Sequence, residues 1–188
     1  MQPVDIIING LIYCGLITAA ILTISRNPRV MLHSYPKEIQ ASVPPKTDVE
    51  KKQTFIYALP ILLVIVLYPL LSIWHTCAMQ HLAYKEILLY TWALTFMFNV
   101  YDLLVLDWLL FCTITPKFMV IKGTEGNRGY KNYRFHFMGF LKGIVITGIL
   151  ALLISGVAYL LCRQGLFSAA AAALAPLVFT TIKYCIIL

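Results

Sequence analysis

The chain has 188 residues, of which 60% are hydrophobic and only 12% charged, and its formal net charge is +7. Because an average soluble domain is about one quarter charged, this composition excludes an ordinary soluble protein and indicates an integral membrane protein. The basic residues accompany no nucleic-acid-binding motif, so we expect anionic lipid head groups as their partners and no nucleic acid.

Five apolar windows follow one another along the chain, at about 4–25, 54–74, 87–113, 140–162 and 168–188. At a rise of 1.5 Å per residue, each window is long enough to cross a hydrocarbon core of about 30 Å as a helix. We therefore expect an all-α fold, with residues 1–188 forming one polytopic bundle of five transmembrane helices. The last window contains an alanine run, Pro176 and Lys183, so four spans with a re-entrant or interfacial C-terminal helix are the alternative.

The basic residues indicate how the chain is threaded. Eleven of the fifteen Lys and Arg residues lie in two connections, 26–53 and 114–139, whereas the opposite connections carry only Lys85 and Arg163. The positive-inside rule therefore predicts that both basic loops are cytoplasmic and that the N-terminus is extracytoplasmic.

The first basic loop contains four prolines, at 28, 36, 44 and 45, which argue against a long helix through it. We expect a solvated linker with a short amphipathic turn. The alternative is that the side chains of His33, Tyr35, Lys37 and Glu38 close over the inner mouth of the bundle.

The third window carries an amide and two carboxylates, at Asn99, Asp102 and Asp107. An ionisable group at mid-bilayer costs about 2.5 kcal/mol or more, so it usually has a partner or a function. On an α-helix the three residues share a face about 140° wide, which should point into the bundle. Asp107 is expected at the inner boundary, with Asp102 about 7.5 Å deeper.

The fourth window begins on the same inner side, which predicts His136 near Asp107 and Lys142 at the depth of Asp102. A buried Asp102–Lys142 ion pair that only fixes helix packing is one interpretation, and a functional site is the other. Gly139 and Gly143 lie on one stripe of this helix. Such a stripe favours close helix packing, including a homo-oligomer, over a ligand cleft.

The second basic loop is rich in charged side chains that are suited to hold a phosphate-bearing lipid or a small anion. An aromatic and basic anchor at the head groups is the simpler interpretation. The candidate anion-binding residues are Glu125, Arg128, Lys131, Arg134 and His136.

The five cysteines are scattered, one near each window, and neither they nor the histidines have a metal-ligand spacing. We therefore expect no metal site, and no motif indicates a cofactor. Cys77 and Cys162 map to the same outer face, where a disulfide is geometrically possible, although free buried thiols are the favoured expectation.

Two hypotheses for function follow. The first is a membrane-embedded enzyme that acts on a lipid or isoprenoid substrate from the cytoplasmic leaflet, with Asp102 or Asp107 as general acid or base and His136 as a second proton carrier. Its substrate-binding residues would be Asn99, Glu125, Arg128, Lys131, Arg134 and Lys142. The second is a small oligomeric transport or ligand-binding module, or a structural subunit of a larger membrane complex.

Overall fold

The computed structural model describes residues 3–77 and 80–165, and within these ranges the regular elements are all helical. Four helical segments are long and apolar enough to cross a membrane: α1 (Pro3–Ser25), α3 (Asp48–Cys77), α4 with its continuation η2 (Tyr84–Ile114), and α5 (Tyr133–Arg163). The all-α membrane bundle is thereby confirmed. The fifth window, 168–188, lies outside the described residues, as does Cys185.

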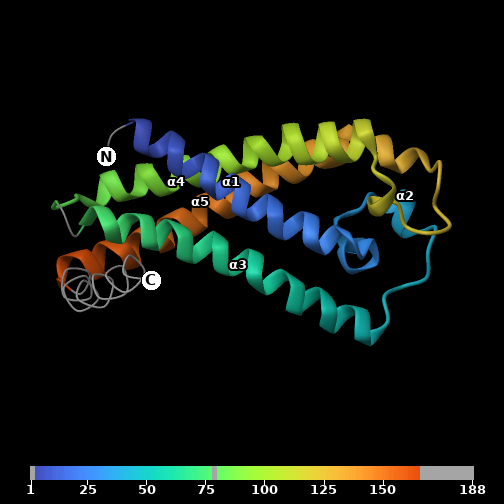
Figure 1. The fold of residues 1–188 in the computed structure, drawn as a ribbon, viewed down its shortest axis with the longest axis horizontal. Helices are drawn as coiled ribbons and strands as arrows, with labels where there is room; N and C mark the ends of the chain where they lie inside the picture. Colours follow the sequence, from blue (N-terminus) through green and yellow to red (C-terminus); the bar gives the residue numbers. More distant parts are fainter. Residues whose placement is uncertain (1–2, 78–79, 166–188) are drawn as a thin grey trace, which may run out of the picture.

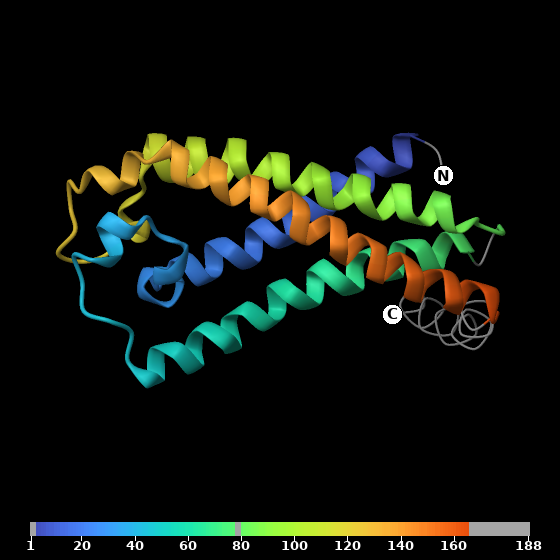
Figure 2. The same cartoon turned by 180° about the vertical axis from the view of Figure 1, so that it is seen from behind.

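The long helices run alongside one another, and both basic loops lie at the same end of the bundle (Figures 1 and 2). We call this the loop end. The start of α1 and the last residues of α3 and α5 lie at the opposite end. The threading therefore brings residues 26–47 and 115–132, far apart in the sequence, to one place.

The half of the bundle away from the loops is filled by a packed core. Its buried side chains come from all four long helices: Tyr13, Ile17, Ile73, Ile87, Tyr90, Leu94 and Ala158. Toward the loop end α3 diverges from α5, as Figure 2 shows for the teal and orange helices. The two halves of the molecule thus differ, one being closed by apolar packing and the other more open.

The first basic loop is folded and not a solvated linker, so that expectation is wrong. It forms the 3-10 helix η1 (Pro28–Ser34) and the short helix α2 (Lys37–Gln40). Its apolar residues, interspersed among the prolines, form a second core with the end of η2 and the second loop: Leu32, Tyr35, Ile39, Phe111, Cys112, Met119, Ile121 and Tyr130. The Tyr35 hydroxyl donates to the Met119 carbonyl at 2.8 Å, which ties one loop to the other.

The second basic loop contains two 3-10 turns, η3 (Lys117–Met119) and η4 (Arg128–Lys131). The Tyr130 hydroxyl accepts a hydrogen bond from the Ile121 amide at 2.9 Å, within the same buried cluster. Asn132 ends this loop and caps α5, because its side chain accepts from the Phe135 amide at 3.0 Å. The cap fixes where α5 begins, and with it the position of His136.

Two cationic side chains hold η1 against the start of α3. The Arg29 guanidinium pairs with Glu50, with 3.0 Å between Nη2 and Oε2. The Lys46 ammonium donates to the Thr54 hydroxyl at 2.8 Å and to the Val30 carbonyl. These contacts position the first loop beside the diverging end of α3.

The last part of the third span is a π-helix, η2 (Asp102–Ile114), where an α-helix was expected. A backbone hydrogen bond across five residues marks its end, because the Thr115 amide donates to the Leu110 carbonyl at 2.9 Å. The Thr113 side-chain hydroxyl also donates to the Trp108 carbonyl, at 2.7 Å. The Lys131 ammonium caps its end by donating to the Thr113 carbonyl at 2.9 Å and to that of Cys112. Side chains thus satisfy carbonyls that the widened final turns leave open.

Candidate functional site

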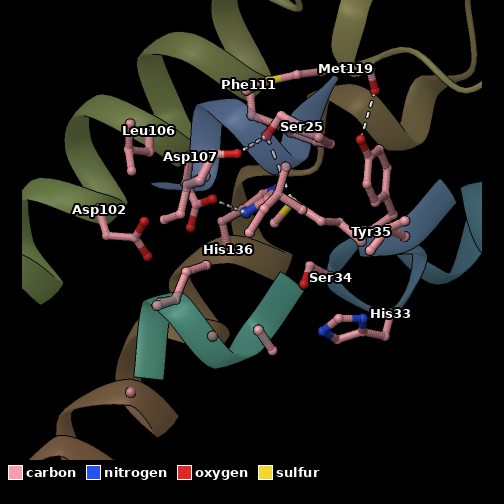
Figure 3. A pocket seen from close by; sticks show the side chains of 18 of the residues that line it. Ser25, His33, Ser34, Tyr35, Asp102, Leu106, Asp107, Phe111, Met119 and His136 are labelled. Carbon is pink, nitrogen blue, oxygen red and sulfur yellow. Dashed lines mark hydrogen bonds and ion pairs between the residues drawn. The ribbon is translucent and has the colours of Figure 1, made fainter. Parts of the chain in front are cut away.

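A cavity of about 480 Å³ lies at the loop end, between α1, η1, α3, the junction of α4 with η2, and α5. Figure 3 shows Asp102, Asp107 and His136 on its wall, together with His33, Ser34 and Tyr35 of the first loop. Its volume is in the usual range for small-molecule sites, about 300–1,000 Å³. The polar residues that made the third and fourth windows unusual therefore meet in one place.

Asp107 and His136 form a hydrogen-bonded pair in this wall, with 2.9 Å between Asp107 Oδ1 and His136 Nδ1. The predicted proximity of these two residues is confirmed. His136 is only 5% exposed, and its Nε2 atom is buried without a hydrogen-bond partner. When an imidazole that donates from Nδ1 to a carboxylate is neutral, its Nε2 atom carries a lone pair that can accept a proton.

The π-helix changes how Asp102 and Asp107 face the cavity. On an α-helix they would be about 140° apart, whereas a turn closed by i→i+5 hydrogen bonds brings residues five apart nearly into line. Both line the cavity. The carboxylate of Asp102 accepts no hydrogen bond from any side chain or amide in residues 3–77 and 80–165, so it is available to a ligand.

Asn99 connects two helices beside the cavity. Its Nδ2 atom donates to the Thr95 carbonyl and to the Thr147 hydroxyl, each at 2.8 Å. A Cβ atom added at Gly143 would lie 2.6 Å from Asn99 Oδ1, so Gly143 is needed for this close approach. The packing interpretation of the glycine stripe thus holds at Gly143.

Gly139 differs from Gly143, because a Cβ atom added there would meet nothing within 4 Å. Both glycines line the cavity, but only at Gly139 is the space beside the glycine open, so the ligand-cleft interpretation of the stripe applies to Gly139. A homo-oligomer through these glycines stays a prediction. Its contact would have to form over the cavity wall.

The predicted Asp102–Lys142 ion pair is wrong. Lys142 is exposed on α5 and takes part in none of the ion pairs formed within the described residues. One residue of α-helix turns it about 100° away from the cavity-lining Gly143. A long side chain at such a place reaches along the surface toward the membrane boundary, so Lys142 fits snorkelling.

Apart from His136, the candidate anion-binding residues do not line the cavity. Glu125 is exposed and accepts from the Gly123 amide at 2.9 Å, and Lys131 caps η2. Arg128 and Arg134 are exposed around a separate shallow hollow that Lys131 and Glu38 also line. The structure thus separates these four residues from Asn99, Asp102, Asp107 and His136.

Sequence reasoning missed the wall that α3 contributes, at Thr54, Tyr57 and Ala58, and treated closure by His33 only as an alternative. Tyr57 and Thr54 lie three residues apart on one helix face, a spacing that could have marked them. Partial burial and the nearby Lys46 ammonium lower the pKa of the His33 imidazole. A neutral His33 is thereby favoured at the cavity mouth.

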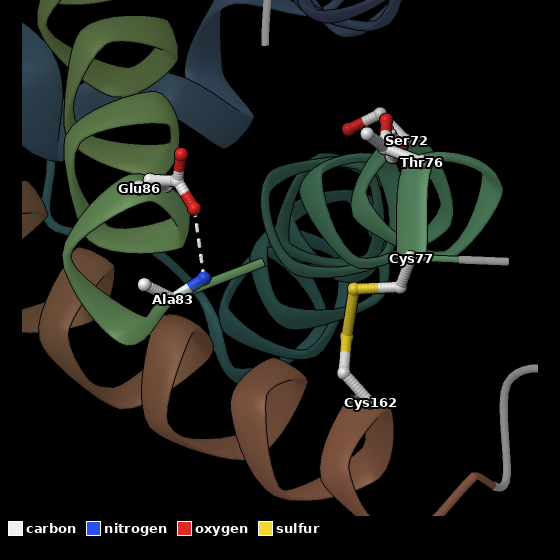
Figure 4. Close-up of a disulfide and its surroundings, with 6 residues drawn as sticks. All are labelled: Ser72, Thr76, Cys77, Ala83, Glu86 and Cys162. Carbon is white, nitrogen blue, oxygen red and sulfur yellow. Dashed lines mark hydrogen bonds between the residues drawn. A yellow bond between two sulfur atoms is a disulfide. The ribbon is translucent and has the colours of Figure 1, made fainter. Parts of the chain in front are cut away.

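The end of the bundle opposite the cavity is closed by a disulfide between Cys77 and Cys162, which joins α3 to α5 with their Cα atoms 6.0 Å apart (Figure 4). The favoured expectation of free thiols is therefore wrong for this pair, and holds for Cys14 and Cys112, which are buried and free. Spacing alone could not decide, because the pairing depends on how the last turns of two helices approach. The disulfide holds together the ends from which α3 and α5 diverge.

No group of three or more His, Cys, Asp or Glu side chains that could hold a metal ion occurs within residues 3–77 and 80–165. Comparison of the chain with protein-family models, with curated proteins and with solved structures found no match. We therefore infer the function from the geometry of the site.

Proposed function

We propose that this protein is a membrane-embedded enzyme that moves a proton on a lipid or isoprenoid substrate, which it takes from the leaflet at the loop end. The observation that carries the proposal is the Asp107–His136 pair: His136 lines a cavity inside the membrane bundle, and its Nε2 atom is buried without a hydrogen-bond partner. Buried polar atoms in native proteins are nearly always hydrogen-bonded, so an orphan at a cavity wall indicates a place for a ligand or water.

The pair is arranged for general acid–base catalysis. His136 Nε2 accepts a proton from a hydroxyl group or water held in the cavity, and Asp107 stabilises the imidazolium that forms. The imidazolium then delivers a proton to a carbon atom of the same substrate, which receives the electron pair released by the first proton transfer, so the reaction is a proton shift with no leaving group. Asp107 is thus a positioning residue for His136. This assignment revises the order of roles expected from the sequence, in which the carboxylates were the principal acid or base.

Asp102 is the second catalytic group of the proposal. Its carboxylate has no hydrogen-bond donor among the described side chains and lies one π-helical turn from Asp107, deeper in the bundle. It can accept a hydrogen bond from the substrate or take up a second proton. Asn99, held between α4 and α5, supports the wall beside it.

A lipid substrate can enter from the side. At the loop end α3 diverges from α5 (Figure 2), and Tyr57 and Ala58 on α3 and Gly139 on α5 are cavity-lining residues that remain exposed. His136 lies three residues after the start of α5, about 4.5 Å along the helix axis. A membrane lipid at this opening would therefore bring its polar end close to His136.

The leaflet is inferred to be the cytoplasmic one. Eleven of fifteen basic residues lie at the loop end, and the Cys77–Cys162 disulfide lies at the opposite end. Positive charge favours the cytoplasmic side, and disulfides persist in oxidising compartments, so the two signals agree. The N-terminus is then extracytoplasmic, and the basic loops contact anionic head groups.

Transport is the second function class expected from the sequence. A path across the monomer would have to pass the packed core around Ile17, Ile73 and Leu94, each of which is fully buried. The one-sided cavity therefore favours catalysis or binding over conduction through a single copy.

The test is solvent-isotope labelling of lipids. Wild-type protein in lipid nanodiscs is incubated with a total membrane lipid extract in D₂O and in H₂¹⁸O, and the lipids are analysed by mass spectrometry. We expect one lipid class to gain label or be converted. Asp107→Asn should slow the labelling or conversion about 10²-fold or more while the protein stays folded. Asp48→Asn, a control at an exposed position, should leave the rate unchanged. Equal rates in wild type and Asp107→Asn would refute the proposal.

A further inference from the structure

We infer that the substrate is a neutral lipid with a hydroxyl head group on one long chain, in the class of fatty and isoprenoid alcohols, and not a phospholipid. The inference depends on the proposed function and names the substrate class of the same cavity. Three properties of the wall carry it: its charge, the placement of its hydroxyl groups and its apolar surface.

The charge of the wall is unsuited to a phosphate. The ionisable side chains that line the cavity are those of aspartate, histidine and tyrosine, and neither lysine nor arginine is among its described lining residues. The ammonium of Lys46, beside the mouth, is already held by the Thr54 hydroxyl and the Val30 carbonyl. A phosphate would lose water without gaining charge-assisted donors, and would face Asp102 and Asp107.

A hydroxyl group matches the polar atoms that are present. It has one donor and two acceptor sites. It can donate to the Asp102 carboxylate, and His136, whose buried Nε2 atom lacks a partner, lines the same cavity. Ser34 on η1 and Tyr57 on α3 line the same cavity, and each carries a hydroxyl group that is able to donate.

The remaining wall is apolar and suits a hydrocarbon chain. It includes Ile21 and Ile24 on α1, Ile61 on α3 and Phe140 on α5. A cavity of about 480 Å³ is large enough for a small polar head group and the first part of a long hydrocarbon chain. Tyr57 and Ala58 on α3 and Gly139 on α5 line the cavity and are exposed, so the rest of that chain can stay in the bilayer.

The experiment uses a photoreactive long-chain alcohol with a diazirine on its chain and the full-length protein in phosphatidylcholine nanodiscs. Hexadecanol, hexadecyl phosphate and hexadecylamine serve as competitors. We expect crosslinks on cavity-lining peptides of α3 and α5, and hexadecanol should compete at least tenfold better than either charged analogue. Equal or better competition by the phosphate or the amine overturns the substrate class.

A pair of variants fixes the location. Gly139→Leu adds a side chain where the wall is open, and should reduce labelling at least tenfold. Gly148→Leu, on the same helix but away from the cavity, should leave labelling unchanged, and equal labelling of both variants overturns the inference. If the substrate class alone is wrong, isotope transfer occurs on another lipid. If the enzymatic function is wrong, the alcohol binds without isotope transfer.

Discussion

Replacing Gly143 with alanine tests the contact that holds the cavity wall together. The new Cβ atom would lie 2.6 Å from Asn99 Oδ1, closer than real contacts allow, so the Asn99 amide must move. That amide donates to the Thr95 carbonyl and the Thr147 hydroxyl, and the second bond joins α4 to α5. Overpacking costs about 1–3 kcal/mol and an interhelical hydrogen bond about 0.6 kcal/mol, so we expect a loss of roughly 2–3 kcal/mol in unfolding free energy.

The assay is unfolding by SDS titration from mild detergent micelles, followed by circular dichroism. Gly148→Ala is the matched control, because its added Cβ atom meets nothing within 4 Å, and it should stay within about 0.5 kcal/mol of wild type. In an Asn99→Ala background the cost of Gly143→Ala should fall below about 0.5 kcal/mol. The same cost in both backgrounds would refute this explanation of the glycine.

Three other predictions concern the loop end and the disulfide. Lys131→Met removes the cap on the carbonyls of Cys112 and Thr113, so it should lower the unfolding free energy by about 1–2 kcal/mol and raise amide hydrogen exchange near Thr115. Lys122→Met, at an exposed position, should cause neither change. The pKa of His33 is lowered in the folded protein, so just below pH 6.5 the unfolded chain binds more protons than the folded one. The unfolding free energy should therefore fall as the pH drops below about 6.5. A His33→Gln variant that shows the same fall would contradict this. The double variant Cys77→Ser, Cys162→Ser removes a disulfide that spans 85 residues, so the unfolding free energy should fall by about 2–4 kcal/mol. Chemical reduction of the wild type should have the same effect. An unchanged unfolding midpoint in both experiments would count against the pairing.

The bundle and much of its polar site could be predicted, because both follow from hydropathy and helical depth. Four apolar windows became four long helices, and counting residues inward from the loop end placed His136 beside Asp107. Depth alone does not give direction, which is why Lys142 was wrongly paired with Asp102. Gly143 lines the cavity, whereas Lys142, one residue earlier on the helix, points about 100° away and is exposed.

The remaining features depend on contacts between distant segments. The π-helix that aligns Asp102 with Asp107 is capped by Lys131, which lies outside the helix and cannot be matched to it from local sequence. The first loop looked like a linker because of its prolines, yet Tyr35 reaches the Met119 carbonyl across 84 residues. Such tertiary contacts override local preferences and appear only when the whole chain is folded.

The central proposal is that His136, positioned by Asp107, transfers the proton. His136→Gln with its matched control His81→Gln tests this proposal most directly. Both replace a histidine by a neutral residue, but His136 is buried at the cavity and His81 is exposed far from it. The measurement is the initial rate of isotope transfer to lipid in nanodiscs, with circular dichroism to show that both variants are folded. We predict that this rate falls about 10²-fold or more in folded His136→Gln and is unchanged in His81→Gln. Wild-type rates in folded His136→Gln would contradict it.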